Sequence, residues 1–175
     1  QHFRPSILPN INLLLTGREE EIEASHNPHS ALPASWLSST VRLIYYWIDY
    51  ALGYWISLRT MCARGATVIF DRYYYDFLVD PRRPKLSGIG ALARFLLKFT
   101  PEPDVVFVLE ADPDIVFERK QELPAREIAR QIVSYRALAQ ERANRFVILD
   151  AAQPPEVVTE QALAALIRHC YKQVI

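Results

Sequence analysis

Three short apolar runs constrain the fold of this chain more than any other feature of its sequence. They span residues 67–70, 104–109 and 145–149, and in each of them apolar, often β-branched residues follow one another without alternation. Such runs are typical of buried parallel strands covered by helices on both sheet faces. An acidic residue follows each run, at Asp71, Glu110 and Asp150. These are expected ligand positions, because α/β folds bind ligands at the carboxyl ends of parallel strands.

Helical patterns separate the apolar runs. We expect helices over residues 37–64, 89–99, 112–121, 124–141 and 154–171. Asp112 and Pro113 supply an N-cap and a first-turn proline for the third of these. Strands that alternate with helices imply right-handed crossovers. The sequence therefore predicts an α/β fold, a doubly wound parallel sheet with helices on both faces.

Composition excludes several classes of partner. Twenty Lys and Arg balance twenty Asp and Glu, so the net charge is 0 and no basic surface for nucleic acid is expected. The aromatic stretch 43–58 has 16 residues with Asp49 inside it, too short for a membrane span; we expect a buried helix, with an interfacial helix as the alternative. Two cysteines without CxxC spacing fit a reducing compartment, which favours the cytoplasm.

Glycine is scarce in a way that bears on nucleotide binding. The chain has only five glycines, and none of them belongs to a GxxxxGK[ST] or GxGxxG pattern. Those patterns form the loops whose backbone N–H groups hold phosphates. A self-contained phosphate-binding loop is therefore absent from these 175 residues.

The segment Asp71-Arg72-Tyr73 carries the strongest chemical signal. A carboxylate at the tip of a strand can hold a hydrated Mg²⁺ beside nucleotide phosphates, and the guanidinium of Arg72 offers a bidentate fork for a second phosphate. The alternative is an Asp N-cap followed by a surface arginine. The role of Asp49 also has two alternatives, because a carboxylate on an apolar helix either makes a structural hydrogen bond or faces a pocket.

In this context, Asp71-Arg72-Tyr73 resembles the DR[YF] sequence of the thymidylate kinase branch of the nucleoside monophosphate kinases. Arg4-Pro5 is similar to the arginine-proline at the end of that family's second strand. Asp49 and Tyr46 fall where the family's long helix faces the nucleotide, and residues 103–113 resemble its fourth strand and the turn that follows. The resemblance covers nearly the whole chain and implies a P-loop NTPase type of fold.

The resemblance implies ATP- and Mg²⁺-dependent phosphoryl transfer to a nucleoside monophosphate or a similar small phosphorylated acceptor. In this reading Asp71 positions Mg²⁺ through water, and Arg119 closes over the transferred group as part of a mobile lid. The implied acceptor-binding residues are Arg4, Tyr46, Asp49, Arg72 and Tyr73, and the implied ATP-binding residues are Arg119, Ala151, Ala152 and Gln153. Asp71, Arg72 and Arg119 form the implied catalytic set. Residues 76–83 become an acceptor-side loop in which Arg82 and Arg83 are either phosphate ligands or surface charge.

The chain also departs from the family pattern. In the family a first strand and a phosphate loop precede the arginine-proline, whereas only three residues precede Arg4 here. We therefore expect residues 1–175 to be a single thymidylate kinase-like domain that lacks its N-terminal strand, loop and helix. Tyr50 stands where the family usually has an arginine, and this difference argues against thymidine monophosphate as the acceptor.

The alternative function is a catalytically inactive kinase-like fold that serves as a binding or assembly module. A homodimer formed through the long helix is a further implication of the resemblance.

Overall fold

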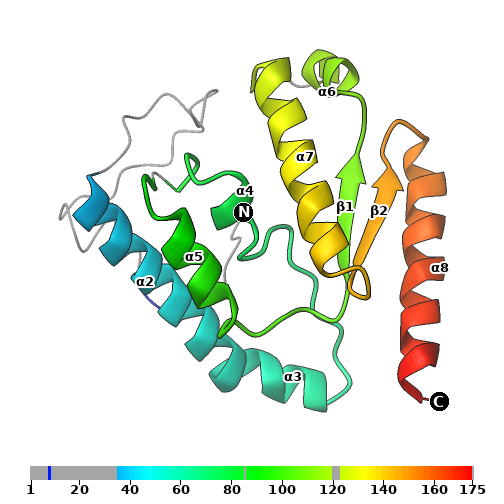
Figure 1. Ribbon diagram of the computed structural model, residues 1–175. Coiled ribbons are helices and arrows are strands. Elements are labelled where there is room, and N and C mark those ends of the chain that lie inside the picture. The colour runs from blue at the N-terminus through cyan, green and yellow to red at the C-terminus, as the bar shows by residue number, and fades with distance from the viewer. Residues whose placement is uncertain (1–7, 9–34, 85, 120–122, 175) are drawn as a thin grey trace. The chain divides into compact units, whose positions relative to one another are not determined.

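The computed structural model describes residues 8, 35–84, 86–119 and 123–174, with the backbone alone at 172–174. The chain forms two compact units, residues 1–101 and residues 102–175. Figure 1 shows that the described part of the first unit is helical, whereas the second combines helices with a small sheet.

A long helix dominates the first unit. It begins as α2 (Trp36–Gly53), continues through one stretch of π-helix, η1 (Tyr54–Leu58), and ends as α3 (Arg59–Ala63). The Ser35 hydroxyl caps its start by accepting a hydrogen bond from the Ser38 amide. Gly65 follows the last turn with a φ of 84°, a conformation that glycine adopts without steric cost.

Two shorter helices complete the first unit. These are α4 (Asp76–Val79) and α5 (Gly90–Leu97), and in Figure 1 α5 runs alongside α2. The Tyr74 hydroxyl donates a hydrogen bond to the Ala93 carbonyl of α5. An aromatic core fills the space between these elements, with Tyr50, Tyr74 and Phe77 almost fully buried. Helix α4 lies within the range for which the sequence predicted only a loop.

The second unit is built on two parallel strands, β1 (Val106–Glu110) and β2 (Phe146–Asp150). Their register places Val106 opposite Phe146 and Glu110 opposite Asp150, so both acidic residues stand at the same edge. Helices α6 (Pro113–Arg119), α7 (Ala125–Glu141) and α8 (Pro155–Val174) complete the unit. In Figure 1 the sheet lies between α7 and α8.

Most of the predicted elements are confirmed, but the strand expected at 67–70 is wrong. These residues pair with no strand in the described part of the chain, and the Ile69 side chain is 88% exposed. A strand needs a hydrogen-bonded neighbour, and among the described residues β1 pairs with β2 alone. The fold is thus α/β with a small two-stranded parallel sheet, and the prediction of a doubly wound sheet is not met by these two strands.

Burial is also less complete than the sequence predicted. Leu109 of β1 is 65% exposed and Ile148 of β2 is 45% exposed, and because these residues lie on opposite faces, each face of the sheet carries an exposed apolar side chain. The helix expected to be buried over 43–58 is buried along one face only, with Leu43 and Tyr50 inside and Ile44 outside. Within the described ranges, no helix combines the length and the apolar character that a membrane crossing requires.

Candidate functional site

Arg72 lies at the centre of the site expected in the first unit. Its guanidinium forms an ion pair with the carboxylate of Asp76, with 2.6 Å between Nη1 and Oδ2. The Asp76 side chain is 12% exposed and that of Arg72 is 37% exposed, so the carboxylate lies behind the guanidinium and the guanidinium faces solvent. Asp71 is exposed next to it. Arg72 is thus a partly exposed arginine in an ion pair, and a role for it in binding a phosphate stays a prediction.

Aromatic packing joins the next two expected residues to the same place. Tyr73 packs edge-on against Tyr50 with 5.1 Å between ring centroids, and its hydroxyl donates to the Pro101 carbonyl. Tyr46 of α2 stacks on Phe77 of α4, with centroids 5.6 Å apart and an interplanar angle of 5°. The structure thus brings Tyr46, Arg72 and Tyr73 around the start of α4.

Asp49 is completely buried on α2, one turn after Tyr46. Its Oδ1 accepts a hydrogen bond from the Leu8 backbone amide at 2.8 Å. This contact matches the structural alternative for the carboxylate, because a buried charge needs hydrogen-bond partners. A role for Asp49 in binding the acceptor stays a prediction.

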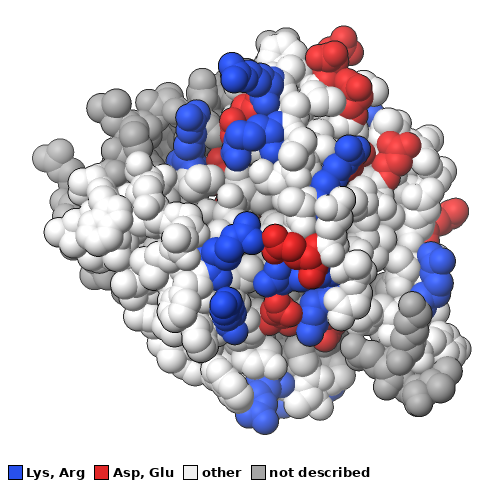
Figure 2. Space-filling view, in the orientation of Figure 1, with Lys and Arg blue, Asp and Glu red and all other residues white. Residues whose placement is uncertain are grey.

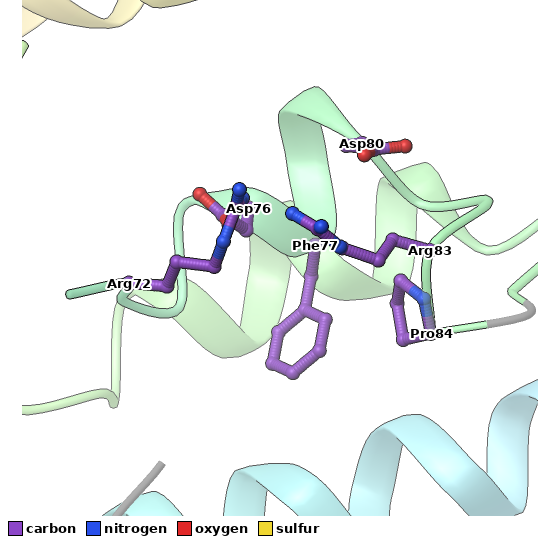
Figure 3. Close-up of a pocket in the computed structure, with 6 residues that line it drawn as sticks. All are labelled: Arg72, Asp76, Phe77, Asp80, Arg83 and Pro84. Atoms are coloured by element: carbon purple, nitrogen blue, oxygen red, sulfur yellow. The ribbon is translucent and has the colours of Figure 1, made fainter. Parts of the chain in front are cut away.

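A small pocket opens beside Arg72 and is drawn in Figure 3. Its lining consists of Arg72, Asp76, Phe77, Asp80, Arg83 and Pro84. Taken as whole residues, Asp76 is 8% exposed and Asp80 is 5% exposed, so two buried acidic residues stand next to two arginines. The pocket itself is small and is lined almost entirely by apolar atoms of these residues.

In the second unit, two of the expected ATP-binding segments meet. The Arg119 guanidinium at the end of α6 donates a hydrogen bond to the Ala151 carbonyl at 2.8 Å. The loop after β2 is held from within, because the Asp150 carboxylate accepts hydrogen bonds from the Ala152 amide and from the Gln153 side chain. Asp150 therefore shapes this loop through its own carboxylate.

The neighbouring acidic strand end has a different partner. Both oxygens of the Glu110 carboxylate accept hydrogen bonds from the Arg136 guanidinium of α7. These hydrogen bonds and the charge of Glu110 raise the pKa of the Arg136 side chain. The sequence predicted ligand-binding acids at these strand ends, whereas both Glu110 and Asp150 make contacts within the protein.

Separate groups of the described residues suit Mg²⁺ and ATP. Mg²⁺ keeps several waters and needs only one or two carboxylates, so the exposed carboxylate of Asp71 suits a water-mediated contact. The exposed Arg119 offers a planar cation, and the loop 151–153 offers backbone groups of the kind that a purine can contact. No cluster of three or more metal-ligating side chains occurs within the described ranges. Arg4 lies outside the described residues.

Charges of both signs share the face drawn in Figure 2. Figure 2 shows basic and acidic side chains interspersed on the face in view, in agreement with the net charge of 0. Anion binding on this face must therefore come from local groups of arginines.

Sequence reasoning missed Asp76 as part of the site. Arg72 and Asp76 are four residues apart, a spacing at which opposite charges meet on a helix. The signal was therefore present in the sequence, but residues 76–83 were expected to form a loop. Because α4 is only four residues long, its helical pattern is too short to be recognised by periodicity.

Comparison with known proteins agrees with the resemblance seen in the sequence. The family model described as thymidylate kinase matches residues 30–162, which is more than half of the chain. The match includes the segment 71–73, Arg119 and the loop 151–153. No curated protein matches the chain significantly. On the family match, this chain belongs to the thymidylate kinase family, whose fold is of the P-loop NTPase type and whose members transfer phosphoryl groups to nucleotides.

Proposed function

We propose that the full-length protein catalyses ATP- and Mg²⁺-dependent phosphoryl transfer to a nucleoside monophosphate or a similar small phosphorylated acceptor. The observation that carries the proposal is the convergence of Tyr46, Arg72 and Tyr73 beside one pocket in the first unit. Tyr46 is far from the other two in the sequence, yet Tyr46 and Tyr73 both pack into the aromatic core, and Arg72 forms an ion pair with Asp76 beside it. Family membership supports the reaction class.

The residues of the first unit would bind and orient the acceptor. The Arg72 guanidinium would hold the acceptor phosphate with two parallel hydrogen bonds, together with Arg4. Asp71 would hold water molecules of a bound Mg²⁺, which neutralises charge on the phosphates of ATP when it is present. Tyr73 and Tyr46 would fix the acceptor side, because both rings are held by neighbouring aromatic rings. Positioning and charge neutralisation then suffice, with no covalent intermediate.

The residues of the second unit would bind ATP. Ala151, Ala152 and Gln153 form a loop that the Asp150 carboxylate holds in place, and Arg119 is hydrogen-bonded to it. We propose that Arg119 also reaches the transferred phosphoryl group when the site closes. Both units would belong to one kinase domain, since the family match extends across them.

ATP binding by the full-length protein tests this assignment. We expect ATP with Mg²⁺ to raise the melting temperature, and Arg119→Ala to weaken ATP binding about tenfold, as the loss of one charge-assisted hydrogen bond predicts. Arg126→Ala is the matched control, because Arg126 is an exposed arginine at the start of α7. Isothermal titration calorimetry measures both affinities. Equal ATP affinity in the two variants would contradict the role of Arg119.

The alternative function is an inactive kinase-like fold that acts as a binding or assembly module. The lack of any phosphate-loop pattern within the 175 residues favours it, because such a loop holds the β-phosphate through backbone N–H groups. The same titration separates the two functions. Complete absence of ATP binding in the full-length protein would favour the module.

We further propose a homodimer formed through α2. Opposite its buried face, this helix exposes an uncharged apolar stripe made of Leu37, Val41, Ile44, Ile48 and Leu52. The residues recur every three or four positions, the spacing at which two helices pack side by side. A second copy offers an identical stripe, which makes the surface complementary to itself.

We propose the cytoplasm as the location of the protein, because there the two exposed cysteines, Cys62 and Cys170, would stay reduced.

A further inference from the structure

The long helix of the first unit continues beyond the residues that pack into the aromatic core. Gly53 is the last buried residue of α2, and neither η1 nor α3 contains a buried residue. In Figure 1 the helix continues past the end of α5 to reach α3. We refer to residues 54–64 as the helical extension. Burial in the core does not account for the apolar side chains that this segment carries.

Large apolar side chains are exposed on the helical extension. Trp55 is 60% exposed, Ile56 is 61% exposed and Met61 is 46% exposed. Groups of exposed apolar side chains mark sites at which proteins contact other proteins or membranes. The helical extension therefore has the composition of an interaction surface, and its charges indicate the kind of partner.

Every charged residue of the helical extension is basic. Arg59 and Arg64 are exposed, and residues 50–70 include no acidic residue. Within the described part of the first unit, Asp71 is the one exposed acidic residue, because the others are buried, namely Asp49, Asp76 and Asp80. The net charge of 0 for the whole chain thus conceals a basic segment, which is complementary to an anionic partner.

Arg59 and Trp55 form one composite group on this segment. The guanidinium carbon of Arg59 lies over the Trp55 ring, 4.9 Å from the ring centroid. Tryptophan is enriched at the membrane–water interface, where its ring lies at the level of the lipid headgroups. Arginine binds the phosphates of such headgroups through charge-assisted hydrogen bonds. Helices that combine arginine with tryptophan and aliphatic residues bind in the plane of this interface, so a lipid surface fits the segment.

We propose that the helical extension is a lipid-binding segment, which binds reversibly to the surface of a membrane that contains anionic lipids. Trp55 and Ile56 would insert among the headgroups, and Arg59 and Arg64 would contact lipid phosphates. The segment lies outside the stripe on α2, so lipid binding and the proposed dimer involve different residues. The inference goes beyond the proposed phosphoryl transfer and does not depend on it.

Binding of the full-length protein to lipid vesicles tests the proposal. Flotation compares vesicles of phosphatidylcholine with vesicles of phosphatidylcholine and phosphatidylglycerol in equal parts. We expect at least about tenfold stronger binding to the anionic vesicles, because each cation near an anionic membrane surface adds to the affinity. Added salt should weaken this binding, since it screens exposed charges. Equal binding to both kinds of vesicle, or binding to neither, would overturn the proposal.

Variants of the helical extension locate the contact. Arg59→Ala should weaken binding to the anionic vesicles about fivefold, the factor expected for one cation near the membrane surface. Arg82→Ala is the matched control and should stay within about twofold, because Arg82 is an exposed arginine of the same unit outside the extension. Circular dichroism checks that both variants keep their helix content. Equal losses of binding in the two variants would contradict the assignment.

Tryptophan fluorescence gives a second readout that does not depend on charge. Insertion of Trp55 among headgroups places its ring in less polar surroundings, so its emission should move to shorter wavelength when anionic vesicles are added. Trp55→Phe should remove this shift, although Trp36 and Trp47 remain. A shift of the same size in Trp55→Phe would place the contact at another tryptophan and would overturn the proposal.

The remaining outcomes distinguish other partners for the same surface. Vesicle binding that is unchanged in Trp55→Ala and lost in Val41→Glu would assign the lipid contact to the stripe on α2, against the proposal. Failure of the unmodified protein to bind vesicles, together with a change from dimer to monomer in Trp55→Ala, would assign the helical extension to an interface between copies of the chain. Light scattering coupled to size-exclusion chromatography gives the masses, and this result would also overturn the proposal.

Discussion

Asp49 is compatible with two roles, a structural hydrogen bond and the binding of the acceptor. Its carboxylate is fully buried, and Oδ1 accepts a hydrogen bond from the Leu8 amide 41 residues earlier in the chain. The resemblance to thymidylate kinases assigns the same residue to the acceptor site. A structural role and a binding role predict different effects of substitution on stability and on acceptor affinity.

Replacement of Asp49 by alanine is expected to destabilise the protein by about 1–3 kcal/mol, because the partly buried Leu8 amide loses its acceptor. Asp49→Asn retains an acceptor oxygen and should lose less. Urea unfolding followed by circular dichroism measures both variants. An equal loss of stability in Asp49→Asn and Asp49→Ala would show that the negative charge, and not the acceptor oxygen, is what matters at this position.

At the scale of elements, sequence periodicity predicted the long helices well. The expected ranges 124–141 and 154–171 correspond to α7 and α8, and the predicted Asp112 cap is confirmed by its hydrogen bond to the Asp114 amide at 2.9 Å. Capping and periodicity are local properties, so they can be recognised in a sequence.

Strand pairing is not local, and this is where prediction failed. The run 67–70 has the composition of a strand, but a strand also needs a partner, and none pairs with it in the described part of the chain. In the site, Arg72 and Tyr73 were found from a motif, whereas Asp76 emerged only from its ion pair with Arg72. Residues join a site through tertiary packing, which a motif does not report.

Tyr74 connects the segment before α4 to α5 and gives this pair of elements a pH dependence. Burial raises the pKa of its phenol above the usual value of about 10. The unfolded chain then loses this proton at lower pH than the folded chain does. The contribution of Tyr74 to stability is therefore fully present below about pH 10 and is lost as the pH rises above it.

Tyr74→Phe should consequently make stability fall less steeply above pH 10. At neutral pH the same variant should lose about 1 kcal/mol, because the hydrogen bond to the Ala93 carbonyl is removed. Urea unfolding at several pH values measures both effects. Tyr171→Phe is the control, since Tyr171 is an exposed tyrosine of α8. Identical alkaline behaviour of the two variants would contradict the burial effect.

For the whole molecule, the stripe on α2 bears on how copies of the chain assemble. Val41→Glu places a charge in the middle of the uncharged apolar stripe, where Val41 is 48% exposed. We expect the unmodified protein to be a dimer and this variant a monomer, because burying an unpaired carboxylate in an interface is unfavourable. Light scattering coupled to size-exclusion chromatography measures the mass of each.

Leu163→Glu provides the control for this experiment. Leu163 of α8 is 56% exposed and lies outside the stripe, so its replacement should leave the dimer intact. A monomeric unmodified protein would contradict the homodimer. Binding of that monomer to lipid vesicles would then favour the interfacial reading of the aromatic helix.

The kinase activity of the whole protein is tested most directly by phosphoryl transfer from ATP, with Mg²⁺, to a panel of nucleoside monophosphates and other small phosphate monoesters. We predict transfer to at least one acceptor, with kcat/KM at least tenfold lower in Arg72→Ala and unchanged in Arg82→Ala. No transfer to any member of the panel, or equal activity of the two variants, would contradict the proposed function.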